Sequence, residues 1–450
     1  MFLESRVMKI RLLVLLILLG AGPLWSQVEP GATGGAAAPE DDERMALPAP
    51  VSGQAYPNAV EDEERSNFLS GGVTFTTSYN DNIEPGSGGT PISDMIYSIL
   101  PTVELNQTMP RQRRALTYSA GFSFYDPTSS LNTVQQNAAL SYEYRVSPRT
   151  TINLHDGFAQ SSNAFNSGTP GSGIPISSSS PPSEAAVIDP YAEMLMNNGN
   201  VELSYQYSKD GMIGGSGSTA LLNYPNPSQA VGLYDFVSEG GSGFLSRRFM
   251  GTQYVGGTYK FYRAVTSGGS STTRTDTIAL FYTIYLNRRV SISVSGGPQH
   301  FDAEYGATPT QSAWTPAVTA SVGWQRKRTN LTAMYMRTVT AGGGLLGTYD
   351  ATSVTGNARW LLAKRWTANV AGSYFVSKNA TTIQYSSFPT GHTVLGTIAL
   401  HHLISEHMDA QVGYSRLHQD YNQITSVASN PDEDQVFFSF SYRFTKPLGR

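Results

Sequence analysis

The chain has 450 residues, a formal net charge of −4 and a charged fraction of 14%, against roughly 25% in typical soluble domains. No basic tail or patch accompanies this charge, so the composition does not indicate a nucleic-acid partner. The sequence has no cysteine, which excludes disulfides, cysteine-ligated metal, a cysteine nucleophile and lipid attachment at an N-terminal cysteine. The stability of the fold must therefore come from packing and backbone hydrogen bonds.

The N-terminal residues 1–26 have the pattern of a secretory signal peptide. Arg6, Lys9 and Arg11 precede the apolar run Leu12–Leu19, and the small residue Ser26 follows at an expected cleavage point. The apolar run is shorter than the roughly 20 residues that a membrane-spanning helix requires. We therefore expect a signal peptide and export across the inner membrane, with a short membrane anchor as the alternative.

Residues 27–67 differ in composition from the rest of the mature chain. They are rich in proline, alanine and glycine and carry two acidic runs, Glu40–Glu43 and Glu61–Glu64. Their apolar content is too low to form a core. We predict a flexible acidic periplasmic segment; a folded plug would need far more than about 40 residues.

From Phe68 onward the sequence has the pattern of β-strands. Apolar and polar residues alternate in 116–124, 201–208 and 366–374, and similar runs recur to the C-terminus. A period of two predicts strands with one apolar and one polar face. No segment shows a sustained helical period with capping residues.

Short polar turns and longer connections alternate between these strands. This order is typical of a transmembrane antiparallel up-and-down β-barrel, in which short periplasmic turns alternate with long outer loops. We predict an all-β barrel of 18 strands over residues 68–446, followed by a short tail, 447–450. The glycine-rich run 211–224 is the weakest strand, and 16 strands is the alternative count. A soluble sandwich or propeller is the alternative fold, but no blade repeat is present.

Basic residues gather at the predicted short turns. We expect them to face the periplasmic side and the anionic lipid headgroups there. Three tryptophans, Trp324, Trp360 and Trp366, lie near the same turns, where indole rings suit the membrane interface. The basic rim residues are Arg111, Arg113, Arg149, Arg248, Arg288, Arg289, Lys327, Arg328, Lys364 and Arg365.

The polar faces of the strands are rich in serine, threonine, asparagine and glycine, with scattered charges. Barrels of this size leave an aqueous channel unless they are plugged. Such a wall indicates a conduit for neutral or weakly charged hydrophilic solutes, and no dense basic ladder indicates phosphate selectivity. The candidate lumen-lining residues are Glu143, Arg145, Glu202, Lys260, Arg274, Asp276, Asp409 and Arg443.

Histidine positions give little indication of catalysis or metal binding. His401 and His402 are adjacent, and neighbours on a strand point to opposite faces. His300 with Asp302 is the best candidate pair, but a hydrogen bond at the barrel rim explains it better, because no nucleophile motif is present. We therefore expect no enzymatic activity, no metal and no cofactor.

The last strand places Phe438, Phe440, Tyr442 and Phe444 on one face. It resembles the C-terminal aromatic strand that the bacterial barrel-assembly machinery recognises, although Thr445–Arg450 follow the final aromatic residue. This resemblance implies that the barrel-assembly machinery and outer-membrane lipid are partners of the chain.

Residues 68–444 as a whole resemble bacterial outer-membrane β-barrel porins, including those linked to exopolysaccharide export. The resemblance implies passive passage of small hydrophilic solutes across the outer membrane. A polysaccharide-export conduit and a closed structural or adhesive barrel are the alternatives.

In general porins, which this topology resembles, the third outer loop folds inward and narrows the pore. The corresponding connection here is 162–196, and its acids Glu184, Asp189 and Glu193 would favour cations. We state this loop as a candidate constriction, with a disordered external loop as the alternative.

Overall fold

The structure is a computed structural model that describes residues 67–83, 91–161, 193–266, 271–287, 289–306, 309–381, 389–422 and 432–448. The predicted signal peptide, the acidic segment up to residue 66 and most of the third outer loop lie outside the described residues, as do Arg288, Glu184 and Asp189. Among the residues that are described, no helix is long and apolar enough to cross a membrane.

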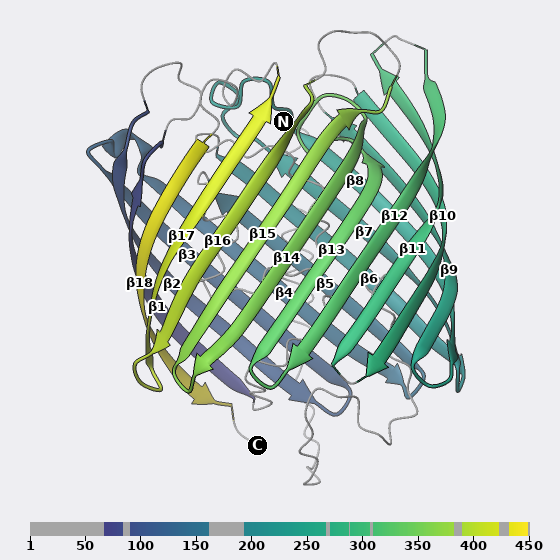
Figure 1. Cartoon of the computed structure of the whole chain (residues 1–450), viewed down its shortest axis with the longest axis horizontal. Helices are drawn as coiled ribbons and strands as arrows, with labels where there is room; N and C mark the ends of the chain where they lie inside the picture. Colours follow the sequence, from purple (N-terminus) through teal and green to yellow (C-terminus); the bar gives the residue numbers. More distant parts are fainter. Residues whose placement is uncertain are drawn as a thin grey trace. The chain divides into compact units, whose positions relative to one another are not determined.

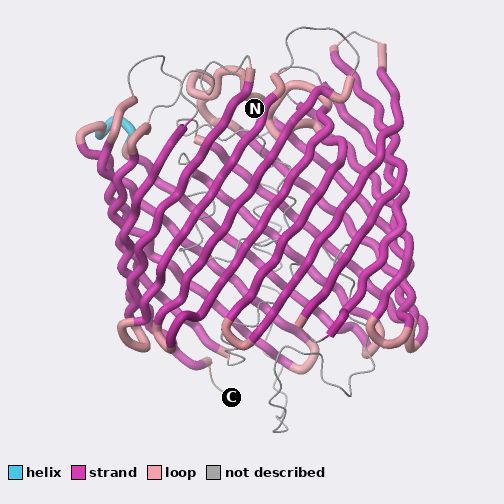
Figure 2. Tube along the Cα trace, in the orientation of Figure 1, coloured by secondary structure: helices cyan, strands magenta, loops and turns pink. Residues whose placement is uncertain are grey.

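The described residues form one closed sheet of 18 antiparallel strands (Figures 1 and 2). Each strand pairs with its neighbours in the sequence, and β1 also pairs with β18, so the sheet has no free edge. The predicted barrel and its count of 18 strands are confirmed. The strands are β1 (Phe68–Asn80), β2 (Asp94–Met109), β3 (Gln112–Asp126), β4 (Thr133–Ser147), β5 (Thr150–Ser161), β6 (Met194–Ser208), β7 (Gly211–Asn223), β8 (Phe236–Phe249), β9 (Gln253–Thr266), β10 (Ser271–Asn287), β11 (Val290–Tyr305), β12 (Gln311–Arg326), β13 (Thr329–Thr340), β14 (Tyr349–Ala363), β15 (Trp366–Asn379), β16 (Gly391–Leu403), β17 (Met408–Tyr421) and β18 (Asp432–Pro447).

The glycine-rich segment that looked weakest in the sequence forms strand β7. It pairs with β6 on one side and with β8 on the other. A side chain at Gly214 would meet the Phe244 ring, because its Cβ would lie 2.5 Å from Phe244 Cε1. The aromatic ring of β8 thus fills the space that this glycine leaves open.

The two faces of the wall differ in polarity. Tyr282 lies opposite Val294, and both side chains are exposed on the outer face, as are Ile278 and Leu280. One residue further along, the Thr283 and Ser293 hydroxyls are buried and lie 2.6 Å apart on the inner face. This alternation gives the barrel an apolar exterior suited to hydrocarbon and a polar interior.

Candidate functional site

Strand pairing brings polar side chains of the inner wall into one row. In this row each residue lies directly opposite the next one on the neighbouring strand, and residues in directly opposite positions share a face of the sheet. The Ser216 and Ser242 hydroxyls within it are 2.7 Å apart. We call the set the lumen row; it runs from β4 to β11 and consists of Glu143, Asn153, Glu202, Ser216, Ser242, Lys260, Thr277 and Gln299.

The lumen row climbs the barrel wall. Glu143 lies near the short-turn end of β4, which ends at Ser147, whereas Gln299 lies beyond the middle of β11, which starts at Val290 on the same side. The climb follows from the tilt of the strands, because a row at right angles to tilted strands ascends around the barrel (Figure 1). Hydrogen-bonding groups therefore follow one diagonal path along the lumen.

Two charged members of the row have no ionic partner. Glu202 is only 4% exposed, and its Oε1 makes no hydrogen bond within the described residues. Lys260 forms no salt bridge with any described residue. Both were predicted to line the lumen, and both lie on its face. The Lys260 side chain is exposed, whereas Glu202 is a buried carboxyl group of the inner wall.

Charges also surround the mouth at the short-turn end. Arg145 Nε lies 2.8 Å from Glu143 Oε1, and Arg113 reaches the same carboxylate at 4.0 Å. Across the barrel, His401 Nε2 lies 3.1 Å from Asp409 Oδ2. These residues face inward, as does Arg443, which alternates with the outward Tyr442 and Phe444. The predicted lumen residues of this end are thus on the inner wall.

Two predicted lumen residues lie on the outer face instead. Arg274 and Asp276 alternate in step with the exposed Ile278 and Leu280, and Asp276 accepts a hydrogen bond from the outward Tyr259. The lumen prediction was wrong for this pair because β10 extends past the apolar belt. Beyond the belt an outward charge is hydrated, so polarity no longer distinguishes the two faces.

The predicted rim residues divide into two groups. Seven lie in the short turns themselves: Arg111, Arg149, Arg289, Lys327, Arg328, Lys364 and Arg365. Arg113 and Arg248 instead lie on strand ends facing inward, where Arg248 Nε pairs with Asp210 Oδ1 at 3.0 Å. Only the turn residues are positioned to meet headgroups.

Aromatic side chains mark both ends of the apolar belt. Trp324, Trp360 and Trp366 lie on the outer face next to the short turns, and Trp366 packs against His402 with ring centroids 4.2 Å apart. Trp314, which sequence reasoning did not single out, is 69% exposed on the outer face toward the long loops. The outward alternation of β18 also carries Phe438, Phe440, Tyr442 and Phe444.

His300 and Asp302, the candidate catalytic pair, lie on the outer face, and each contacts a different residue of β12. His300 packs against Trp314 with ring centroids 4.9 Å apart, and Asp302 accepts a hydrogen bond from Ser312 Oγ. Within the described ranges, no group of three or more histidine, cysteine, aspartate or glutamate side chains is arranged to hold a metal ion.

One outer connection crosses the mouth at the long-loop end. We call it the bridge; it comprises Ala341–Thr348, between β13 and β14. The Tyr234 backbone N–H, in the β7–β8 connection, donates to the Gly344 carbonyl at 2.8 Å. Since β7 and β14 are well separated in the 18-stranded order, the bridge joins distant parts of the wall.

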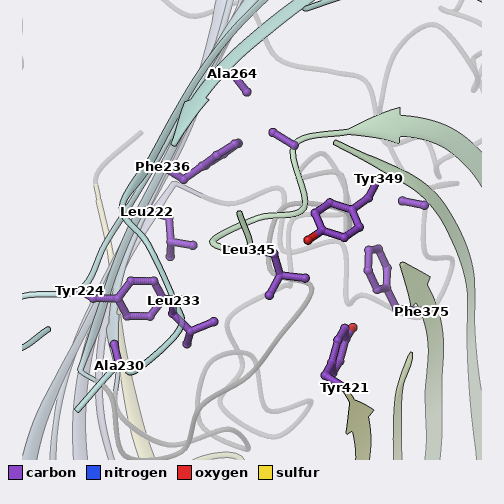
Figure 3. Packing of buried hydrophobic residues seen from close by; sticks show 12 residues of the cluster. Leu222, Tyr224, Ala230, Leu233, Phe236, Ala264, Leu345, Tyr349, Phe375 and Tyr421 are labelled. Atoms are coloured by element: carbon purple, nitrogen blue, oxygen red, sulfur yellow. The ribbon is translucent and has the colours of Figure 1, made fainter. Parts of the chain in front are cut away.

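An apolar cluster holds the bridge in place. Leu345, which is 0% exposed, lies between two groups of side chains in Figure 3. One group comes from β7, β8 and their connection, and the other comes from β14, β15 and β17. The labelled members are Leu222, Tyr224, Ala230, Leu233 and Phe236 on the first side and Tyr349, Phe375 and Tyr421 on the second, together with Ala264 of β9.

Hydrogen bonds to β11 hold the chain just before the bridge and at its end. Val339 N–H donates to Gln299 Oε1 at 2.8 Å, so the last member of the lumen row also anchors β13. Thr348 N–H donates to Tyr305 Oη at 2.7 Å. At Gly342 φ is +75°, and a Cβ would lie 2.5 Å from the Tyr349 ring, so this corner needs glycine.

The bridge was not predicted, and the predicted constriction cannot be compared with it. Of the three acids proposed for the third outer loop, only Glu193 is described, and its Oε1 accepts a hydrogen bond from Gln160 Nε2. A signal for the bridge was present in the sequence. Residues 341–347 read AGGGLLG, two adjacent leucines in a connection that would otherwise be polar.

No protein-family model matches the chain, and a search of curated proteins finds no match. Solved bacterial outer-membrane barrels are similar in structure at low identity. Pseudomonas aeruginosa OccK9 (OpdG) matches with a TM-score of 0.42 and 13% identity over 86% of this chain and 100% of its own. Acinetobacter baumannii OccAB4 gives 0.41 and 8% over 86% and 100%. The ferric citrate transporter FecA gives 0.41 and 12%, and this chain spans 65% of its length.

Proposed function

We propose that this protein is an outer-membrane channel for the passive passage of small hydrophilic solutes. The observation that carries the proposal is the lumen row, which places amide, hydroxyl and charged groups along one diagonal path on the inner wall. A solute that enters from bulk water can replace its hydrogen bonds to water, one after another, with hydrogen bonds to these groups. The apolar outer face supports the location in a bilayer.

The bridge supports a limit on solute size. It crosses the mouth from β13 to the β7–β8 connection and is held by buried leucine and tyrosine side chains. Solutes would have to pass beside it. The row itself contains two carboxylates and one ammonium group among neutral side chains, which suits neutral or weakly charged cargo.

Liposome swelling with sugars of graded size tests this function. Protein-loaded liposomes should swell with monosaccharides and progressively less with oligosaccharides, whereas protein-free liposomes should not swell. A chain with Gly343–Leu346 deleted should admit larger sugars. If the native protein admits no solute while the deletion variant does, the native barrel is closed and the passive-passage proposal fails. If neither admits solute, a structural or adhesive barrel is the better description.

A polysaccharide-export conduit is the second candidate. A hydroxyl-rich row extending along the wall would serve a polymer as well as a monomer, which is the observation in its favour. A bridge fixed across the mouth opposes it. Linear dextrans added to a planar bilayer distinguish the two, because an export conduit should show long, length-dependent current blockades and a small-solute channel should exclude the chains.

A further inference from the structure

A cavity of about 230 Å³ lies toward the long-loop end. Strands β1, β3, β4, β5 and β18 contribute to its lining, together with the β7–β8 connection that also touches the bridge. Seven planar polar side chains line it: Asn80, Asn132, Gln160, Glu193, Asn226, Gln229 and Glu433. Carboxamide and carboxylate groups offer paired hydrogen-bonding atoms in one plane.

Apolar side chains line another part of the cavity. Ile83, Tyr125 and Leu131 line the same cavity and pack together with Ile96 in one apolar cluster. The cavity thus combines planar hydrogen-bonding groups with an aromatic and aliphatic surface. A ligand that fits it needs an apolar face and an edge rich in hydroxyl groups.

Three of the polar groups have unused hydrogen-bonding capacity. Glu433 is only 2% exposed; one of its oxygens accepts from Asn80 Nδ2, and the other has no partner within the described residues. A buried acceptor without a donor is unfavourable, which favours a ligand that donates a hydrogen bond to it. The side chains of Asn226 and Gln229 are exposed, and neither makes a hydrogen bond to the described part of the chain.

The charge of the lining favours some ligands over others. Glu193 is acidic, and neither lysine nor arginine is among the residues that line the cavity. An anionic ligand would therefore meet repulsion without compensation. The volume is below the roughly 300–1,000 Å³ of pockets for drug-sized ligands, which indicates a small solute.

We propose that this cavity is a binding site for a neutral monosaccharide at the outer entrance of the channel. The sugar's C–H face would lie against Tyr125 and Leu131, and its hydroxyls would pair with Asn226, Gln229 and the free oxygen of Glu433. The identification of the sugar as cargo rests on the proposed channel function. The binding itself does not, so the two can be tested separately.

Isothermal titration calorimetry of the full-length protein in detergent tests the site with three probes of equal size: glucose, glucuronate and glucosamine. Glucose should bind at least about tenfold more tightly than glucuronate. The double variant Asn226→Ala/Gln229→Ala should weaken glucose binding by about tenfold or more. Ser228→Ala, in the same connection but absent from the lining, is the matched control and should bind as the native chain does.

A substitution of Glu193 tests whether the cavity excludes anionic sugars. Glu193→Gln keeps the planar shape but removes one negative charge, so glucuronate binding should rise relative to glucose. Absence of glucose binding, equal binding of glucuronate by the native chain, or binding of glucosamine alone would each overturn the proposal. So would an equal loss in Ser228→Ala and the double variant.

Swelling assays on the same preparations separate this proposal from the channel function. Glucose uptake without glucose binding would leave the channel intact and reject the site. Glucose binding without uptake would support the site as a receptor and reject passive passage.

Discussion

The two mouths of the barrel differ in what limits them. At the short-turn end, connections such as Pro110–Arg111 are brief and leave an opening lined by the Glu143–Arg145 and His401–Asp409 pairs. At the long-loop end, the bridge crosses the opening and is buried among apolar side chains. This difference comes from the connections between the strands. The comparison shows that packed apolar side chains occupy the outer mouth, whereas ion pairs line the short-turn mouth.

Shortening the bridge should have the largest effect on this asymmetry. Deleting Gly343–Leu346 removes Leu345 and the Gly344 carbonyl that accepts from Tyr234 N–H. The outer mouth should then be about as wide as the mouth at the short-turn end, and single-channel conductance in a planar bilayer should rise several-fold. An unchanged conductance would mean that the bridge does not lie on the conduction path.

A point variant makes the same comparison without changing chain length. Leu345→Ala removes a fully buried side chain and should weaken the packing of the bridge by about 2–5 kcal/mol, giving noisier and larger currents. Leu346→Ala is the matched control, because Leu346 is only partly buried. Equal behaviour of the two variants would contradict a specific role for the Leu345 contact.

Deleting 171–182 tests the third outer loop as a second constriction at the same mouth. We predict a smaller rise in conductance than the bridge deletion gives, together with a reduced preference for cations. If the loop folds inward as expected, shortening it would withdraw Glu184 and Asp189, which follow the deleted residues, from the pore. The measurements are single-channel conductance and reversal potential in a salt gradient. No change in either quantity would reject the loop as a constriction.

Neutralising one acidic residue should alter the ion selectivity of the periplasmic mouth. Glu143→Gln leaves Arg145 and Arg113 without their carboxylate, so the reversal potential in a salt gradient should shift toward anion permeation while conductance changes little. Glu239→Gln is the control, since Glu239 follows the outward alternation of Val237 on β8 and lies outside the lumen. A similar shift in both variants would indicate a long-range surface effect.

The smallest effect is expected from the turns outside the lumen. Lys327→Gln/Arg328→Gln removes two cations from a turn that should face anionic headgroups, each contributing up to about 1 kcal/mol near an anionic surface. The unfolding temperature should fall slightly in anionic lipid and remain unchanged in neutral lipid. Greater stability in anionic lipid would contradict the predicted orientation.

The strands were predictable because their signal is local. Period-two alternation and the order of short and long connections require only neighbouring residues, and even the glycine-rich β7 was placed correctly. The lumen row was not predicted, because it depends on the register between strands, which brings Glu202 level with Ser216 and Ser242 level with Lys260. Sequence reasoning therefore identified Glu143, Glu202 and Lys260 as lumen residues but described them as scattered.

The bridge and the outward charges show two other limits of sequence reasoning. A run of glycines has no preferred path of its own. The path of residues 341–347 is set by the adjacent Tyr349 and by Tyr224 and Tyr234, which are distant in sequence. The lumen prediction for Arg274 and Asp276 was wrong for a different reason. Polarity indicates the lumen only at the depth of the hydrocarbon, and the sequence does not mark where that depth ends.

The pairing of β1 with β18 has a consequence for biogenesis. Thr74 and Thr76 meet Ser441 and Ser439 through side-chain hydrogen bonds between positions more than 360 residues apart. Contacts of such long range form late, because loop closure must precede them. Until the last strand arrives, two rows of peptide groups remain unpaired and hydrocarbon offers them no substitute. A chain whose synthesis stops before residue 432 therefore lacks the strand that closes the sheet and leaves unpaired peptide groups at the depth of the hydrocarbon.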